Sequence, residues 1–169
     1  QRWVLDTLLG IGGWDVLHPE AQGFFEELVY NHADAARVFG QVKSGVMFPK
    51  AWSLTAAELE RKGQHYEKRG FSRAARDLYV RAAVSYGRAQ YSYYRDDERK
   101  RRFHAKMVEC YRRVMDLNPT PIERVEIPFE GKTLYAVLHL PARSGKFPAV
   151  ILGPGMDMFK EDWHNIAQT

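Results

Sequence analysis

The clearest candidate for chemistry in this chain is a glycine-rich turn near its end, Gly153-Pro154-Gly155. The turn follows residues 149–152, an apolar run typical of a buried strand, and it precedes charged residues that suit the start of a helix. Glycine lets the backbone turn sharply, and proline restricts its freedom. Backbone N–H groups fixed in this way form half of the oxyanion hole in many hydrolases, where they stabilise the negative charge of the reaction intermediate.

Histidine and cysteine suggest little further chemistry. The histidines show neither the His-x-x-x-His nor the His-Glu-x-x-His spacing of a zinc site, so no metal is expected; they are His18, His32, His65, His104, His139 and His164. We expect His65 and His139 at the surface or in structural hydrogen bonds, and His164 in a helix after the turn. Cys110 is the only cysteine, which excludes an internal disulfide and fits a reducing cytosol.

Composition and charge indicate which classes of protein the chain can belong to. A hydrophobic content of 45% with 13% aromatic residues is enough for a packed core. No apolar run approaches the roughly 20 residues that span a bilayer, and residues 1–6 do not resemble a signal peptide, so a cytoplasmic protein is expected. The net charge of +4 arises in the first part of the chain. Its densest basic run, residues 95–102, also contains acidic residues and indicates a solvated helix face, not a nucleic-acid site.

Helical patterns fill the chain up to a break at residues 118–121. Residues 20–43 predict one long or two short helices. A helix over residues 56–69 is framed by Thr55 and Glu58, which have the spacing of a capping box, and by Gly70 at the position of a C-cap.

Two more helices are expected before the break. Ser72 is a candidate N-cap for a helix that runs to about Tyr94, and Asp96 can cap the next one. Apolar and aromatic residues recur in both at spacings of three and four, which predicts two buried stripes; they are Tyr79, Ala83, Tyr86, Gln90 and Tyr93, then Phe103, Met107, Cys110, Val114 and Leu117. A place in the second stripe favours a buried Cys110 over a reactive thiol.

The period of the pattern changes to two after the break. Residues 122–129 and 132–140 alternate as strands, and Glu130-Gly131 supplies the turn of a β-hairpin. Residues 149–152 are apolar on both faces, as expected of a strand covered on both sides in an α/β sheet.

Small residues and tyrosines in residues 63–91 also allow a different interpretation, a tetratricopeptide-like helix pair in a protein-interaction module. Such a solenoid needs about three repeats of 34 residues, and no second copy occurs at that period. The tyrosines then belong to the core of an irregular helical domain, or line a pocket.

Five segments together resemble a known family: residues 81–91 (RAAVSYGRAQY), 111–113 (YRR), 119–131 (PTPIERVEIPFEG), 140–141 (LP) and 148–161 (PAVILGPGMDMFKE). They look like the N-terminal part of α/β-hydrolases that carry a helical domain ahead of the hydrolase core. This group includes dihydroxypseudooxynicotine hydrolase, fermentation-respiration switch esterase-like proteins and fungal hydrolases that shorten polyketide chains. The turn departs from the Gly-Gly-Leu pattern associated with the group, which leaves the substrate open.

The resemblance implies an α/β fold in which an N-terminal all-helical lid domain, residues 1–118, is followed by the first strands of an incomplete α/β-hydrolase sheet. Residues 119–169 would contain the hairpin, a central strand and the oxyanion loop. In this fold one oxyanion donor is the N–H after the nucleophile and the other comes from the loop after the third strand. By the motif, Met156 supplies that second N–H, and Gly155 shapes the loop. Asp157, Lys160 and Glu161 are expected to fix the loop and start the next helix.

The resemblance also implies a serine-type enzyme that cleaves a small-molecule ester, or the carbon–carbon bond next to the carbonyl of a ketone in a retro-Claisen reaction, through an oxyanion intermediate. The motif that presents the serine, Gly-x-Ser-x-Gly, does not occur, and Ser144 lies in a loop ahead of the apolar run. The chain, which starts at Gln1, is therefore expected to be the N-terminal piece of a longer hydrolase, with the remainder of the hydrolase domain as its partner and the nucleophile outside it. A homodimer stays open, and no cofactor, nucleic acid or membrane partner is expected.

Overall fold

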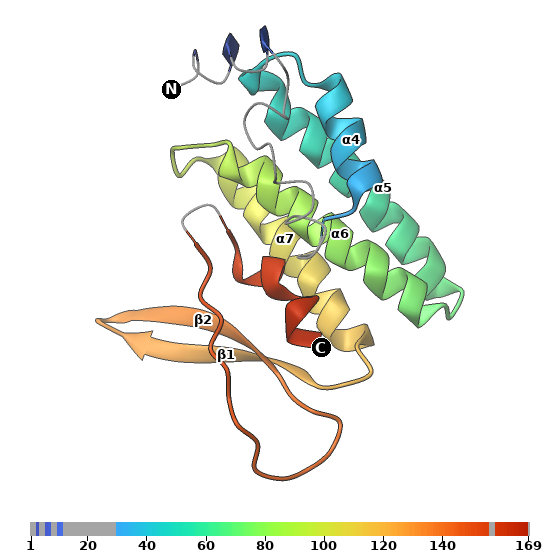
Figure 1. The fold of residues 1–169 in the computed structure, drawn as a ribbon, viewed down its shortest axis with the longest axis vertical. Coiled ribbons are helices and arrows are strands. Elements are labelled where there is room, and N and C mark those ends of the chain that lie inside the picture. The colour runs from blue at the N-terminus through green and yellow to red at the C-terminus, as the bar shows by residue number, and fades with distance from the viewer. Residues whose placement is uncertain (1–2, 4–5, 8–9, 12–29, 156–157, 169) are drawn as a thin grey trace.

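The computed structural model describes residues 3, 6–7, 10–11, 30–155 and 158–168, and it places α-helices before strands (Figure 1). The helices of residues 30–168 are α4 (His32–Gln41), α5 (Phe48–Lys68), α6 (Ser72–Tyr91) and α7 (Glu98–Leu117). The strands are β1 (Ile122–Phe129) and β2 (Lys132–His139). Within residues 30–168 as described, three short 3-10 helices complete the order: η1 (Gly45–Met47), η2 (Lys160–Trp163) and η3 (Ile166–Gln168). The part of the predicted first helix before residue 30 lies outside the described residues.

The connection between α5 and α6 ends the first helix as the sequence predicts. Gly70 has a φ of 80°, a conformation that glycine adopts without strain. The N–H of Phe71 donates to the carbonyl of Tyr66 at 3.0 Å, and the N–H of Gly70 donates to that of Glu67 at 2.9 Å. These two bonds form a Schellman motif, and the rings of Tyr66 and Phe71 add its apolar contact, with centroids 6.1 Å apart. The prediction of a helix end at Gly70 is confirmed.

The helix starts differ from the predictions. Helix α5 begins at Phe48, with Pro49 in its first turn, so Thr55 is a buried mid-helix residue and not a cap. The reason is tertiary, because Phe48 and Trp52 extend the apolar stripe of the helix by two turns and both are buried. Helix α6 begins at Ser72 itself, without a side-chain cap.

The start of α7 is shifted by one residue from the expected cap at Asp96. Asp97 is the N-cap, and its carboxylate accepts a hydrogen bond from the N–H of Lys100 at 3.0 Å. Asp96 forms a salt bridge with Arg101 instead.

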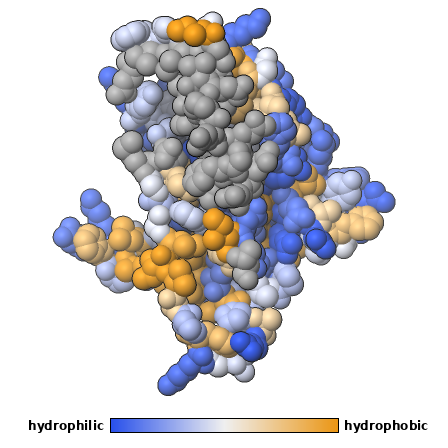
Figure 2. All heavy atoms as spheres, viewed as in Figure 1, coloured by the Kyte–Doolittle hydropathy of each residue, from blue (hydrophilic) through white to orange (hydrophobic). Residues whose placement is uncertain are grey.

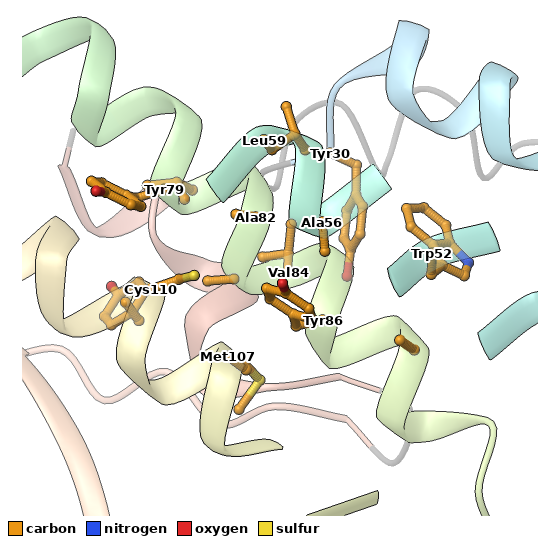
Figure 3. Close-up of a cluster of buried hydrophobic side chains, with 14 of the residues drawn as sticks. Tyr30, Trp52, Ala56, Leu59, Tyr79, Ala82, Val84, Tyr86, Met107 and Cys110 are labelled. Atoms are coloured by element: carbon orange, nitrogen blue, oxygen red, sulfur yellow. The ribbon is translucent and has the colours of Figure 1, made fainter. Parts of the chain in front are cut away.

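The core lies between α5, α6 and α7, with α6 in the middle (Figures 1 and 3). Both predicted stripes point into it: Tyr79, Ala83, Tyr86 and Gln90 are buried, as are Met107, Cys110 and Val114. The tyrosine hydroxyls donate to carboxylates of α5, Tyr79 to Glu67 and Tyr86 to Glu60, each at 2.7 Å. The tyrosine stripe is therefore core, and burial raises the pKa of the Cys110 thiol, as expected of an unreactive cysteine.

Strands β1 and β2 form the predicted hairpin, paired antiparallel from Ile122 with His139 to Phe129 with Lys132. Glu130 and Gly131 both have positive φ, 46° and 73°, which is the two-residue turn that suits the twist of a hairpin. One face turns toward the helices through buried Ile122 and through Val137, which packs against the core. The other face exposes large apolar side chains: Ile127, Phe129, Leu134 and Leu138.

Residues 149–152 differ from the expectation of a buried strand. They pair with neither strand of the hairpin, and the side chains of Val150 and Ile151 are 82% and 94% exposed. A strand exists only where a neighbour completes its hydrogen bonds, and the described residues offer this run no such neighbour. Figure 2 shows apolar side chains gathered over the lower left of the molecule, where Figure 1 places the hairpin and the segment that crosses it.

None of the described helices combines the length and the apolar character needed to cross a bilayer.

Candidate oxyanion loop and its anchors

The candidate loop, residues 153–158, lies in the sequence between the exposed apolar run and the segment from Phe159 that packs on the helices. Gly153 and Gly155 are exposed, and a Cβ at Gly153 would meet nothing within 4 Å. Met156 and Asp157 lie outside the described residues, so the expected oxyanion donor, the N–H of Met156, stays a prediction. The N–H of Met158 donates to the carbonyl of Gly155 at 3.2 Å.

The first anchor after the loop is Phe159, whose ring packs on α6 at Gly87. A Cβ at Gly87 would lie 3.0 Å from two atoms of that ring and 3.1 Å from the sulfur of Met107, so a larger residue would fit only if the ring and the sulfur moved. Tyr91, one turn further along α6, meets the Phe159 ring edge-on with centroids 6.3 Å apart. The residue that follows the candidate loop is thus seated in a notch of the middle helix.

The second anchor is Asp162, whose carboxylate is completely buried. Its Oδ1 accepts a hydrogen bond from the hydroxyl of Tyr30 at 2.9 Å. Its Oδ2 accepts from the N–H of Phe159 at 3.0 Å and from Nη2 of Arg88, on α6, at 3.3 Å. Arg88 Nε also donates to the Tyr30 hydroxyl at 2.5 Å. Three segments far apart in the sequence therefore meet at one carboxylate.

Burial and charge pairing shift the pKa of Asp162 in opposite directions. Desolvation raises the pKa of Asp162, while the positive charge of Arg88 and the bonds from Phe159 and Tyr30 lower it. Burial also raises the pKa of Tyr30 well above its ordinary value, which keeps its hydroxyl protonated as a donor. The guanidinium of Arg88 lies 4.9 Å from the Tyr30 ring centroid and 5.7 Å from that of Phe159, so the rings shield the ion pair from water.

The third anchor joins the end of η2 to α7 and β2. The Tyr111 hydroxyl lies 3.0 Å from Nδ1 of His164 and 3.4 Å from Nε2 of His139, so it can donate to one ring and accept from the other. Gln168 Nε2 lies 2.8 Å from Nδ1 of His139. Burial lowers the pKa of His164 to about 4 and also lowers that of His139. Both rings are therefore neutral at pH 7, and the expectation of a hydrogen-bonded structural His139 is confirmed.

The residues expected to start a helix after the loop do so in a shorter form. Lys160 and Glu161 open η2, a 3-10 helix, and Lys160 Nζ lies 2.7 Å from Glu161 Oε1. Within the described part of the chain, no group of three or more His, Cys, Asp or Glu side chains could hold a metal ion.

Sequence reasoning did not find Arg88, Asp162 or Tyr30 as parts of the site. Asp162 is 74 residues from Arg88 and 132 from Tyr30, and no local motif reports a contact over such separations. Asp162 stands in a charged stretch, between Glu161 and Trp163, and no local pattern marks it as buried. Chemically, these three groups satisfy one another's hydrogen bonds and so hold the segment in place.

Comparison with known proteins identifies first the fold class of the chain and then its family. A fold search finds the crystal structure of a 2,6-dihydroxy-pseudo-oxynicotine hydrolase, with a TM-score of 0.58 and 22% identity, covering 73% of this chain and 34% of that one. The fold is accordingly α/β, with a helical region followed by the first strands of an incomplete α/β-hydrolase sheet. The model of the esterase FrsA-like family matches residues 46–169, and the chain belongs to this family.

Curated relatives carry matching names. Esterase FrsA of Photobacterium profundum is 30% identical over 111 residues, which are 66% of this chain and 26% of that protein. The 2,6-dihydropseudooxynicotine hydrolase of Paenarthrobacter nicotinovorans is 30% identical over 66% of this chain and 30% of its own length. Hydrolase ORFZ of Pyricularia oryzae is 32% identical over 79% of this chain and 35% of its own length. The chain thus spans about a quarter to a third of the length of these relatives.

Proposed function

We propose that this chain forms the helical lid domain, residues 1–118, and the start of the core, residues 119–169, of a serine-type α/β-hydrolase. The whole enzyme would cleave an ester, or a carbon–carbon bond next to a carbonyl in a retro-Claisen reaction, through an oxyanion intermediate. The single observation that carries the proposal is membership of the esterase FrsA-like family, whose model covers the candidate loop.

The loop is the part of the chain to which we assign chemistry. An oxyanion needs preorganised donors at about 2.7–3.1 Å, because groups that must first reorganise lose much of their stabilising effect. The N–H of Met156 would be one donor, with Gly155 shaping the loop, and the N–H after the serine nucleophile would be the other. Support comes from the three anchors that begin within a few residues of the loop, at Phe159, Asp162 and His164.

The exposed apolar surface supports a role as part of a larger domain. Ile127, Leu134 and Leu138 on the hairpin, with Val150 and Ile151, are poorly covered. An apolar patch of this kind on a stable protein marks a surface that another element covers. We assign that element to the remainder of the hydrolase sheet, which would turn residues 149–152 into a central strand and would also carry the nucleophile, the acid and the histidine.

The substrate would be a small-molecule ester or ketone, and the enzyme would act in the cytoplasm without a cofactor. The alternative of a tetratricopeptide-like interaction module finds no support in the comparisons, because the relatives named above are all esterases or hydrolases.

Fluorophosphonate labelling of the full-length protein tests the proposal. A serine nucleophile beside a working oxyanion hole reacts covalently with the probe, so intact mass should rise by one adduct and hydrolysis of short nitrophenyl esters should be lost in parallel. Heat-denatured protein is the control, because an adduct that needs the folded site disappears there. Failure of the folded protein to react would remove the serine mechanism.

A further inference from the structure

Helix α6 carries two arginine–aspartate pairs of similar chemistry and different destinations. Arg81 bonds to Asp34 of α4 through Nε at 2.7 Å and Nη2 at 2.9 Å. Arg88, two turns further along the same helix, bonds to Asp162 of η2. The first pair joins two helices of the helical region. The second joins the helical region to the segment that follows the candidate loop.

The Arg88 pair is the more deeply buried of the two. Side-chain exposure is 13% for Arg88 and 0% for Asp162, against 31% and 11% for Arg81 and Asp34. A buried pair of this kind adds little net stability, since the loss of solvation offsets the attraction, but breaking one partner leaves an uncompensated charge. A pair that is costly to break and adds little net stability is suited to holding two segments in one relative position.

The segment that these bonds fix begins directly after the loop. Asp162 accepts a hydrogen bond from the N–H of Phe159, so the residues just after the loop are held to the same carboxylate as Arg88 and Tyr30. On the other side of the loop, residues 150 and 151 are almost fully exposed and pair with neither strand of the hairpin. Of the described residues on either side of the loop, those on the C-terminal side are therefore the ones bonded to the helices.

We propose that Arg88 and Asp162 are positioning residues that fix Met158 and Phe159, at the end of the loop, against α6, so that the helical region sets the place of the oxyanion donor. This inference rests on the proposed function of the loop. It gives the helical region a role beyond that of a cover over the substrate, because any displacement of α6 relative to the core displaces the donor as well.

The expected kinetic signature is a loss in kcat. A misplacement of about 1 Å can cost on the order of 100-fold in rate, because the oxyanion forms only as the transition state is approached. Ground-state binding of substrate does not use this donor, so KM should change little.

The test uses the full-length enzyme with four variants. Arg88→Met removes the charge and keeps most of the bulk, Arg88→Lys keeps the charge, and Asp162→Asn keeps the shape of the acceptor. Arg81→Met is the matched control on the same helix. We expect Arg88→Met and Asp162→Asn to lower kcat at least 10-fold with KM within about 3-fold, Arg88→Lys to recover part of the loss, and Arg81→Met to keep kcat while lowering the melting temperature.

Amide hydrogen exchange supplies a readout that does not depend on activity. Exchange of peptides that cover residues 150–160 should become faster in Arg88→Met and Asp162→Asn and stay unchanged in Arg81→Met. Equal exchange and equal kcat in the Arg88 and Arg81 variants would overturn the inference. If Arg88→Met fails to fold, the comparison of Asp162→Asn with Arg81→Met decides the same question.

Different results would contradict the proposed function and the positioning role. A wild-type enzyme that does not react with a fluorophosphonate contradicts the proposed function, while loop exchange that depends on Arg88 still supports the anchoring. A reactive enzyme whose kcat and loop exchange ignore Arg88 and Asp162 contradicts only the positioning role.

Discussion

The helical region, α5 to α7, and the strand region, residues 122–155, hold similar kinds of apolar residue and bury them very differently. Tyr79, Met107 and Val114 of the helices are almost fully covered. In the strand region, Phe129 and Leu134 are about half exposed, and Ile151, outside both strands, is 94% exposed. The helices therefore bury their apolar surface within the chain. The strands present a surface that we assign to the remainder of a hydrolase domain, and residues 153–158 connect this surface back to the helices.

This difference predicts that substitutions in the two regions affect different properties. Changes in the helical core should lower stability. Changes in the loop should lower activity and leave the free energy of unfolding of the helices nearly unchanged.

The largest expected effect is on catalysis by the full-length enzyme. Met156→Pro removes the backbone N–H that we assign as an oxyanion donor, and kcat should fall roughly 10²- to 10³-fold. Met156→Leu keeps the N–H and changes only the side chain, so its kcat should stay within a few-fold of wild type. Equal kcat values for the two variants, from steady-state ester hydrolysis, would rule out Met156 as a donor.

The next prediction compares a buried side chain of the helices with an exposed side chain of the hairpin. Met107→Ala empties a side chain that is 1% exposed and should lower the free energy of unfolding by about 2–5 kcal/mol. Leu134→Ala, at a strand position 49% exposed, should cost about 0.5 kcal/mol or less in this chain. Urea denaturation followed by circular dichroism at 222 nm measures both. Similar losses would mean that the hairpin face is buried in solution.

A pH effect is expected from the third anchor. Folding lowers the pKa of His164 from 6.5 to about 4 because the ring is buried, so protonation favours the unfolded state. The free energy of unfolding therefore keeps its full value above about pH 6.5. It decreases by about 3 kcal/mol as the pH falls toward 4. His164→Gln should flatten this part of the stability profile, measured by urea denaturation at pH 7, 5.5 and 4. An unchanged slope would show that His164 is not the group responsible.

The smallest effect tests the notch that holds Phe159. Gly87→Ala places a Cβ 3.0 Å from the Phe159 ring and should lower stability by about 1 kcal/mol, because overpacking outweighs the gain in helix propensity. Gly40→Ala, in α4, meets nothing within 4 Å and should be stabilising by about 0.5 kcal/mol or more. The opposite signs of the two shifts in thermal melting are the result to look for, and a stabilised Gly87→Ala would contradict the packing of Phe159.

Local patterns predicted the parts of the fold that are determined locally. The helix end at Gly70 and the turn at Glu130-Gly131 need only positive φ and neighbouring hydrogen bonds, and both are found. The capping-box spacing of Thr55 and Glu58 misled because burial of Phe48 and Trp52 extends the helix past it.

Features that depend on contacts between distant segments could not be predicted from local sequence patterns. The pairing of Arg88 with Asp162 joins residues 74 apart and leaves no periodic signal. The apolar run 149–152 has the composition of a buried strand, yet whether it forms one depends on neighbours that the described residues do not provide.

The central claim is that the loop supplies an oxyanion donor held in place by the helices, and a crystal structure of the full-length enzyme with a covalent phosphonate adduct tests it most directly. The account predicts that the phosphonyl oxygen lies about 2.7–3.1 Å from the backbone nitrogen of Met156, with the Arg88–Asp162 pair intact behind the loop. An adduct whose oxygen accepts its hydrogen bonds from other groups, with the Met156 nitrogen out of reach, would contradict it.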